Sequence, residues 1–149
     1  MGLTPWRRRV ELEWNMSAVP SDFVLHTRSS AVTKPWEPIY ACQREGSFRL
    51  GLVIGEAHAN SRGMLHGGVI AALADNAMGL TLGHAMGGAQ RFVTTALSID
   101  YFGTGKAGQW LEMVPRIVGQ GKSSGVVDAL VLADGVTIAR ANATFRAVG

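Results

Sequence analysis

Alternating apolar and polar residues dominate the second half of the chain and predict β-strands there. Successive side chains of a strand point to opposite faces of its sheet, so a period of two marks a half-buried strand. Asp134-Gly135 is a strong two-residue hairpin signal, and the other breaks are also short. Strands joined so closely must be antiparallel. The expected strands cover residues 91–102, 110–118, 126–132 and 136–148.

A nearly continuous apolar stretch predicts one long helix over residues 67–85, ended by Gly87-Gly88. Its apolar positions cover more than one face, so the helix is expected to be buried nearly all round. Small residues along it, such as Ala74, Ala77 and Gly79, would let a sheet or a second helix approach closely. An element of this kind must lie inside the fold.

The N-terminal part of the chain is less regular. Residues 1–20 show no steady periodicity, and we interpret them as an arm preceding a single domain over residues 21–149. Ser21 and Asp22 are helix-capping residue types and predict a short helix reaching about Arg28. Two strands are expected after it, over residues 39–44 and 48–54, with a turn at residues 45–47.

The order of these elements predicts an α+β fold in which a curved antiparallel sheet wraps one long central helix. The chain has 149 residues, of which 47% are hydrophobic, enough for one domain with a real core. Cys42 is the only cysteine, so no internal disulfide can form and a cytoplasmic location is expected.

The charge pattern limits the class of partner. The net charge is +3 and the pI is near 9.5, but the basic residues are scattered rather than gathered in a stripe. This favours a small polyphosphate ligand over nucleic acid. No apolar run is long enough to predict a membrane span, and no histidine, cysteine or acid spacing predicts a metal site.

Asp75 is the one carboxylate in the apolar helix and the residue that most needs an explanation. Desolvating an acid is costly unless a partner offsets the loss of water. Asp75 is therefore either an inert acid paired with a basic side chain or a functional group. At the start of the same helix, Gly67 and Gly68 offer backbone N–H groups with no intrahelical partner, at the positive end of the helix dipole.

The segment Asn60-x-x-Gly63-x-Leu65-His66-Gly67-Gly68, followed by Asp75, resembles the hotdog-fold thioesterases, in particular the PaaI-like acyl-CoA thioesterases. The resemblance implies a hotdog fold and hydrolysis of acyl- or aryl-acyl-CoA to the free acid and CoA. It also implies a homotetramer, with no cofactor other than the CoA of the substrate.

The resemblance also suggests roles for individual residues. The Gly67 N–H would bind the oxyanion, and Asp75 would act as general base or nucleophile, two roles that the sequence does not separate. Asn60 would lie near the thioester or the attacking water, Thr94 would orient that water, and His66 would brace the loop. Contacts to the CoA part would come from Gly68, Lys122, Ser123 and Ser124, with Arg91 and Arg146 as weaker candidates for its phosphates.

Helix geometry adds a constraint that does not depend on the resemblance. Eight residues separate Gly67 from Asp75, which is about 12 Å along a helix. One Asp side chain cannot cross that distance to a carbonyl held at its own helix N-terminus. If both groups act on one thioester, they come from two chains whose helices run antiparallel. The sequence therefore predicts a homodimer at minimum.

Two other functions fit a hotdog domain. One is a non-catalytic protein that binds acyl-CoA, although the presence of both Asp75 and Asn60 argues against it. The other is a dehydratase or hydratase, which resembles a different pattern, with an acid and a histidine placed for proton transfer. That pattern is not found in this chain.

Overall fold

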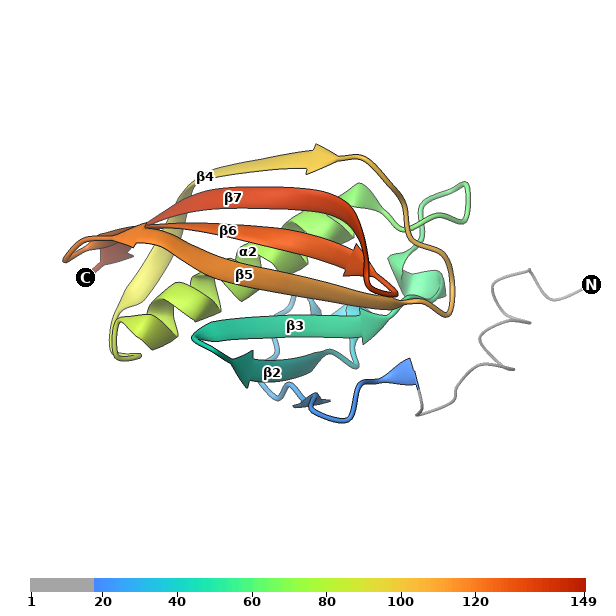
Figure 1. Ribbon diagram of the computed structural model, residues 1–149, viewed down its shortest axis with the longest axis horizontal. Helices are drawn as coiled ribbons and strands as arrows, with labels where there is room; N and C mark the ends of the chain where they lie inside the picture. The colour runs from blue at the N-terminus through green and yellow to red at the C-terminus, as the bar shows by residue number, and fades with distance from the viewer. Residues whose placement is uncertain (1–17) are drawn as a thin grey trace, which may run out of the picture.

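The computed structural model describes residues 18–149, which form one seven-stranded sheet and one long helix (Figure 1). Most of the expected N-terminal arm lies outside these residues. The strands occur in the order β1-β2-β3-β5-β6-β7-β4, and every neighbouring pair is antiparallel. The elements are β1 (Val24–Leu25), β2 (Tyr40–Arg44), β3 (Ser47–Val53), α2 (Gly67–Ala85), β4 (Arg91–Tyr101), β5 (Trp110–Gln120), β6 (Ser124–Ala133) and β7 (Val136–Val148), with short 3-10 turns at Lys34–Trp36 and Glu56–His58.

The predicted architecture, a curved antiparallel sheet around one long helix, is confirmed. Helix α2 begins and ends where the apolar pattern predicts, and the six predicted strands agree with the structure within two residues at either end. The sheet packs against one side of α2, where Leu73, Met78 and Leu82 are almost fully buried. Thr81 joins the two layers, since its hydroxyl accepts a hydrogen bond from the Phe48 N–H at 2.9 Å. Within residues 18–149, no helix has the length and apolarity needed to cross a membrane.

Two hairpins have tight two-residue turns. Glu45 and Gly46 have φ angles of 52° and 76°, and Asp134 and Gly135 have φ angles of 46° and 80°. Positive φ at both central positions matches the right-handed twist of the flanking strands and favours glycine at the second position. The Asp134-Gly135 hairpin predicted from sequence is thereby confirmed.

The expectation that α2 is buried nearly all round is wrong for this chain. The side of α2 away from the sheet is open, with Asn76 and His84 exposed and Asp75 half-buried. The sheet curves around only one side of the helix, and several positions opposite it carry no large apolar side chain. Asp75 therefore lies on the open side of the helix, facing away from the apolar core.

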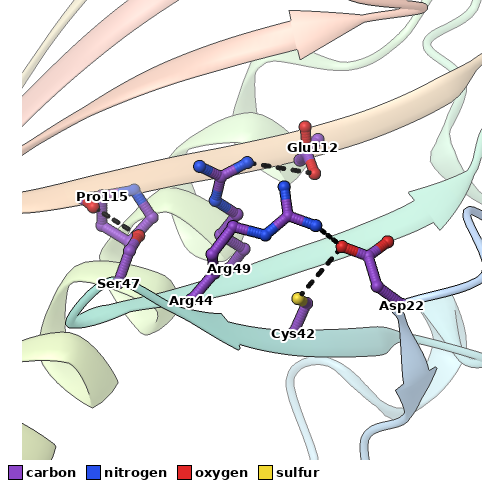
Figure 2. Close-up of polar contacts among 7 residues, drawn as sticks. All are labelled: Asp22, Cys42, Arg44, Ser47, Arg49, Glu112 and Pro115. Atoms are coloured by element: carbon purple, nitrogen blue, oxygen red, sulfur yellow. Dashed lines mark hydrogen bonds and ion pairs between the residues drawn. The ribbon is translucent and has the colours of Figure 1, made fainter.

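The helix predicted from Ser21 to about Arg28 is also wrong. Residues 24–25 form strand β1, which pairs with β2 through Val24–Ala41 and Leu25–Tyr40. The Asp22 carboxylate does not cap a helix; it accepts a hydrogen bond from the Cys42 thiol and pairs with Arg44 (Figure 2). Tertiary contacts to β2 outweigh the local capping preference of this segment.

Among the strands of residues 18–149, β4 forms one edge of the sheet and pairs only with β7 (Figure 1). It contains a β-bulge, because the register passes from Thr94–Phe145 to Ala96–Thr144 and leaves Thr95 as an extra residue. Apolar side chains of this strand are exposed, with Val93 at 45% and Leu97 at 41% of their full accessible area. In the part of the chain that the structure describes, the free edge of β4 is covered by no other strand.

Candidate functional site

Asp75 and Thr94 are in direct contact. The Thr94 hydroxyl of β4 donates a hydrogen bond of 2.6 Å to Oδ1 of Asp75, halfway along α2. This length is typical of a charge-assisted bond to a carboxylate. No basic side chain among residues 18–149 pairs with Asp75, so the inert ion pair considered from sequence is not what the structure contains. Thr94 holds one carboxylate oxygen, and the other accepts no hydrogen bond from residues 18–149.

An open cavity of about 820 Å³ begins at this pair and follows the uncovered side of α2. Its walls come from the helix, the start of β4, the loop after β1, and single residues of β3 and β7. Asp75 is the only acid among the described residues that line it. The lining residues are His26, Arg28, Ser29, Ser30, Thr33, Phe48, Asp75, Asn76, Gly79, Leu80, Gly83, His84, Gly88, Ala89, Gln90, Arg91, Phe92, Thr94 and Phe145.

The start of α2 presents one unpaired backbone donor. His66 is the N-cap, and its Nδ1 accepts a 2.8 Å hydrogen bond from the Gly68 N–H. The carbonyl of His66 accepts from the Val69 N–H at 3.0 Å. Within residues 18–149, the Gly67 N–H has no acceptor. It is therefore the donor that a ligand carbonyl could use, and His66 acts there as a brace for the turn.

Asn60 orders the loop that leads to this turn. Its Oδ1 accepts hydrogen bonds from the backbone N–H groups of Arg62, at 2.9 Å, and Met64, at 3.1 Å. Both bonds require the oxygen on this side, so the Nδ2 amide points away from them. That amide has no acceptor among residues 18–149 and can donate to a bound molecule.

Tyr101 is part of this arrangement and was missed by the sequence reasoning. Its hydroxyl donates a 2.7 Å hydrogen bond to the Gly67 carbonyl, and a Cβ at position 67 would lie 3.3 Å from its ring. Desolvation raises the pKa of Tyr101 above its ordinary value of 10.0, so the hydroxyl remains a donor at neutral pH. A tyrosine near the end of a strand gives no signal by itself, because tyrosine is common in strands.

The site residues expected from sequence fall into two groups in one chain. Asp75, Thr94 and Arg91 line the cavity, whereas Asn60, His66, Gly67 and Gly68 lie at or before the start of α2 and do not. The α2 helix is continuous between Gly67 and Asp75, so the separation of about 12 Å inferred from sequence holds.

The residues expected to contact CoA are less concentrated. Lys122, Ser123 and Ser124 lie at the β5–β6 connection and do not line the cavity, although Gln90 of the cavity wall donates to the Lys122 carbonyl at 3.5 Å. Arg146 pairs with Val93 and Ser124 in the sheet and lies outside the cavity as well.

The loop after β1 contributes cavity residues that the sequence reasoning did not identify. His26 and Arg28 line the cavity, and the His26 ring meets Phe48 edge-on with ring centroids 5.9 Å apart. Burial, and then the positive charge of Arg28, lower the pKa of His26 below its ordinary value of 6.5. Among the described residues, no group of three or more His, Cys, Asp or Glu side chains could hold a metal ion.

Comparison with known proteins identifies relatives of this chain. The family model of the thioesterase superfamily matches residues 62–140, which include Gly67, Asp75 and Thr94. PA0474 of Pseudomonas aeruginosa, named as a candidate esterase, is 33% identical over 104 residues, 68% of this chain and 77% of the relative.

Solved structures share the fold. BH2602 from Bacillus halodurans, crystallised with CoA, is 32% identical with a TM-score of 0.72, over 83% of this chain and 82% of that one. The E. coli PaaI protein from the phenylacetic acid degradation operon has a TM-score of 0.72 at 24% identity, over 81% and 86% of the two chains. At this level of identity, the similarity to the PaaI protein is one of fold alone.

Proposed function

Because this chain belongs to the thioesterase superfamily and is a thioester hydrolase, we propose that it hydrolyses acyl-CoA esters to a carboxylic acid and CoA. The observation that carries the proposal is the 2.6 Å Thr94–Asp75 hydrogen bond at the cavity, where Asp75 is the only lining acid among residues 18–149. The bound CoA of the similar BH2602 structure supports CoA as the thiol part of the substrate. So does the net charge of +3, which suits a polyphosphate.

Asp75 would supply the base of the reaction. Its carboxylate takes a proton from a water molecule, the resulting hydroxide adds to the thioester carbonyl carbon, and the carbonyl oxygen becomes an oxyanion. When this intermediate collapses, the carbon–sulfur bond breaks and the CoA thiolate leaves and is protonated. Thr94 holds one Asp75 oxygen so that the other faces the water. In the alternative, Asp75 attacks the carbonyl itself and water then hydrolyses the mixed anhydride.

The oxyanion would be bound by the free Gly67 N–H, a type of contact worth about 10²- to 10³-fold in rate. Since Gly67 and Asp75 of one helix are too far apart to share a thioester, the donor comes from a second copy of the chain. The unpaired Asn60 amide of that second copy would reach the same thioester or the attacking water.

The edge of β4 is the surface through which we propose that two copies associate. It presents unpaired backbone groups and exposed apolar side chains, including Val93 and Leu97. Pairing of β4 with its symmetry mate would continue the sheet and set the two α2 helices side by side and antiparallel. A tetramer would be formed from two such dimers.

Substitution of Asp75 tests the proposed activity. The purified protein is incubated with a panel of acyl- and aryl-acyl-CoA esters, and released thiol is followed. Asp75→Asn keeps an oxygen for Thr94 but cannot take up a proton, so kcat is expected to fall about 10²- to 10⁴-fold. Asp100→Asn is the matched control, because Asp100 is an exposed β4 acid that pairs with Arg140 outside the cavity. Tight binding of CoA esters with no thiol release by the wild type would instead indicate a binding protein.

Isotope labelling separates the two roles of Asp75. In a single turnover in ¹⁸O-labelled water, a general base places the label in the released acid alone. Direct attack, followed by water attack on the Asp75 carbonyl carbon of the anhydride, leaves the first label in the Asp75 carboxylate, where peptide mass spectrometry detects it.

A further inference from the structure

We propose that the preferred acyl group ends in a carboxylate, which Arg28 and Arg91 of the cavity wall bind. This inference rests on the proposed acyl-CoA hydrolysis and adds the class of acyl group. It follows from the shape of the cavity, the charges on its walls and the place of the reacting carbon.

The cavity provides room for an acyl chain along α2. Gly79 and Gly83 follow Asp75 at intervals of four residues, so all three lie on the same side of the helix. A Cβ at Gly83 would meet nothing within 4 Å, so the space there is open. From Asp75 to Gly83 the helix advances about 12 Å. A chain attached to a carbonyl at Asp75 can therefore extend past two helical turns.

The charges on the walls are unequally distributed. Arg28 and Arg91 both line the cavity, and neither guanidinium group has an ion pair or hydrogen bond with a residue in 18–149. The one acid in the lining, Asp75, is already held by Thr94. Two uncompensated guanidinium groups in a concave site are suited to a carboxylate, which arginine binds through paired N–H donors.

The apolar part of the wall is limited and comes from Phe48, Phe92 and Phe145 with Leu80. These side chains can contact methylene groups or a ring in the middle of an acyl group. The rest of the wall is mostly polar, so a methyl-terminated chain that reached it would leave polar groups without partners. A terminal carboxylate would accept hydrogen bonds from the donors among these polar groups.

In this proposal Arg28 and Arg91 contact the acyl group, which reassigns Arg91 from the CoA contact that the family resemblance implied. The carbonyl carbon must lie at Asp75, and the acyl and thiol parts leave it in different directions. Residues 122–124, the segment expected to contact the nucleotide, do not line the cavity. Binding of an acyl carboxylate and binding of the CoA phosphates would affect KM differently. The first involves only the carboxylate-terminated esters, whereas the second involves every CoA ester.

Matched substrate pairs test the proposal. Glutaryl-, adipyl- and suberyl-CoA are compared with the methyl-terminated esters of the same chain length, for the wild type and for Arg28→Gln and Arg91→Gln. The wild type is expected to favour the carboxylate-terminated member in kcat/KM by about tenfold or more. Each substitution should raise KM for that member about 10- to 100-fold, the range for a lost hydrogen bond to a charged group, and leave KM for the neutral member within about threefold. Arg116→Gln, which removes a charge paired with Asp128 away from the cavity, is expected to leave KM unchanged for both members of each pair.

Two outcomes overturn the inference and leave thioester hydrolysis intact. One is equal or better turnover of the methyl-terminated esters by the wild type. The other is a rise in KM for both members of a pair in Arg28→Gln and Arg91→Gln, which would assign these arginines to the CoA phosphates. Absence of thiol release from every ester is a distinct result, since it rejects the proposed function itself.

Discussion

A single hydroxyl distinguishes Asp75 from an ordinary surface acid. Thr94 lies on an exposed strand, yet its Oγ1 is 2.6 Å from the carboxylate and fixes the direction in which the acid points. A carboxylate free to rotate would spend part of its time away from the reacting water. The position of one side chain therefore decides whether Asp75 can act as a base.

Replacing Thr94 by valine removes this hydroxyl and keeps the side-chain shape. We expect kcat to fall about 10- to 100-fold, because hydrogen bonds to charged groups are worth about 1.5–3 kcal/mol. The melting temperature should change little, since position 94 is exposed. Thr94→Ser retains the hydroxyl and should recover most of the activity. If valine and wild type hydrolyse CoA esters at the same rate, Thr94 has no part in the reaction.

His58 shows how one buried residue makes stability depend on pH. Its Nδ1 accepts from the Gly55 N–H at 2.9 Å, and its Nε2 lies 3.0 Å from the Trp36 carbonyl. The neutral ring satisfies both contacts, with Nε2 as donor, whereas a protonated Nδ1 would face another N–H group. Desolvation lowers the pKa of His58 below its ordinary value of 6.5, although both backbone contacts oppose the shift.

Because the folded-state pKa is lowered, the unfolded chain binds the proton more readily. The stabilisation from neutral His58 is therefore present above pH 6.5 and lost as the pH falls through 6.5 toward the folded-state pKa. Urea unfolding at pH 7.5 and 5.5 should show a smaller acid-induced loss of stability for His58→Gln than for the wild type. His84→Gln, at an exposed position, should behave like the wild type. An equal loss in all three proteins would contradict the prediction.

At the scale of elements, strand β4 contacts α2 at both groups that the proposed reaction needs. Thr94 bonds to Asp75 in the middle of the helix, and Tyr101 bonds to the Gly67 carbonyl at its start. The strand therefore holds the base and the oxyanion donor, although these two serve different active sites in the proposed dimer.

Tyr101→Phe tests the second contact. It removes the 2.7 Å hydrogen bond and keeps the ring that packs against Gly67. We expect kcat to fall about 3- to 10-fold with KM nearly unchanged, since an ordinary hydrogen bond is worth about 0.5–1.5 kcal/mol and this one positions the donor without touching substrate. Steady-state kinetics on one good ester decide the matter. A change confined to thermal stability would mean that Tyr101 is only structural.

Long, regular elements could be predicted from the sequence, and features that depend on distant contacts could not. Helix α2 and six strands were predicted from the spacing of apolar residues, and the motif at residues 60–68 identified Asp75 and Gly67 as candidate site residues. The segment at 21–28 was mistaken for a helix because the pairing of Asp22 with Arg44 joins residues far apart in the chain. The same holds for the Tyr101 contact with Gly67 and for Arg28 in the cavity wall, since nothing in the local sequence marks either position.

At the scale of the molecule, a single chain has the open side of α2 and the free edge of β4 uncovered. In the proposed reaction it holds only part of each active site. Each chain has the proposed base, Asp75, held by Thr94 and the proposed oxyanion donor at Gly67, but on one helix these two residues lie about 12 Å apart. The proposed dimer brings each base to the donor of the other chain.

Leu97→Glu tests this dependence, because it places a charge on the exposed β4 edge and leaves Asp75 and Gly67 unchanged. We expect the dimer to dissociate in analytical ultracentrifugation and activity to fall at least about 100-fold, in line with loss of the oxyanion donor. Leu130→Glu, at an exposed apolar position on β6, serves as control. A fully active monomeric variant would exclude the two-chain site.

The extra residue in β4 has a consequence for how this chain can vary in length. Thr94 and Tyr101 are seven residues apart, an odd spacing that would put them on opposite faces of a regular strand. They reach the same helix because Thr95 is unmatched in β7 and shifts the alternation by one. Deleting Thr95 would restore the regular alternation of side chains along β4. Either Thr94 or Tyr101 would then point away from α2, while the strand itself remains. We therefore expect the deletion to retain a cooperative thermal transition yet lose thioesterase activity, and relatives that keep both contacts to keep the bulge.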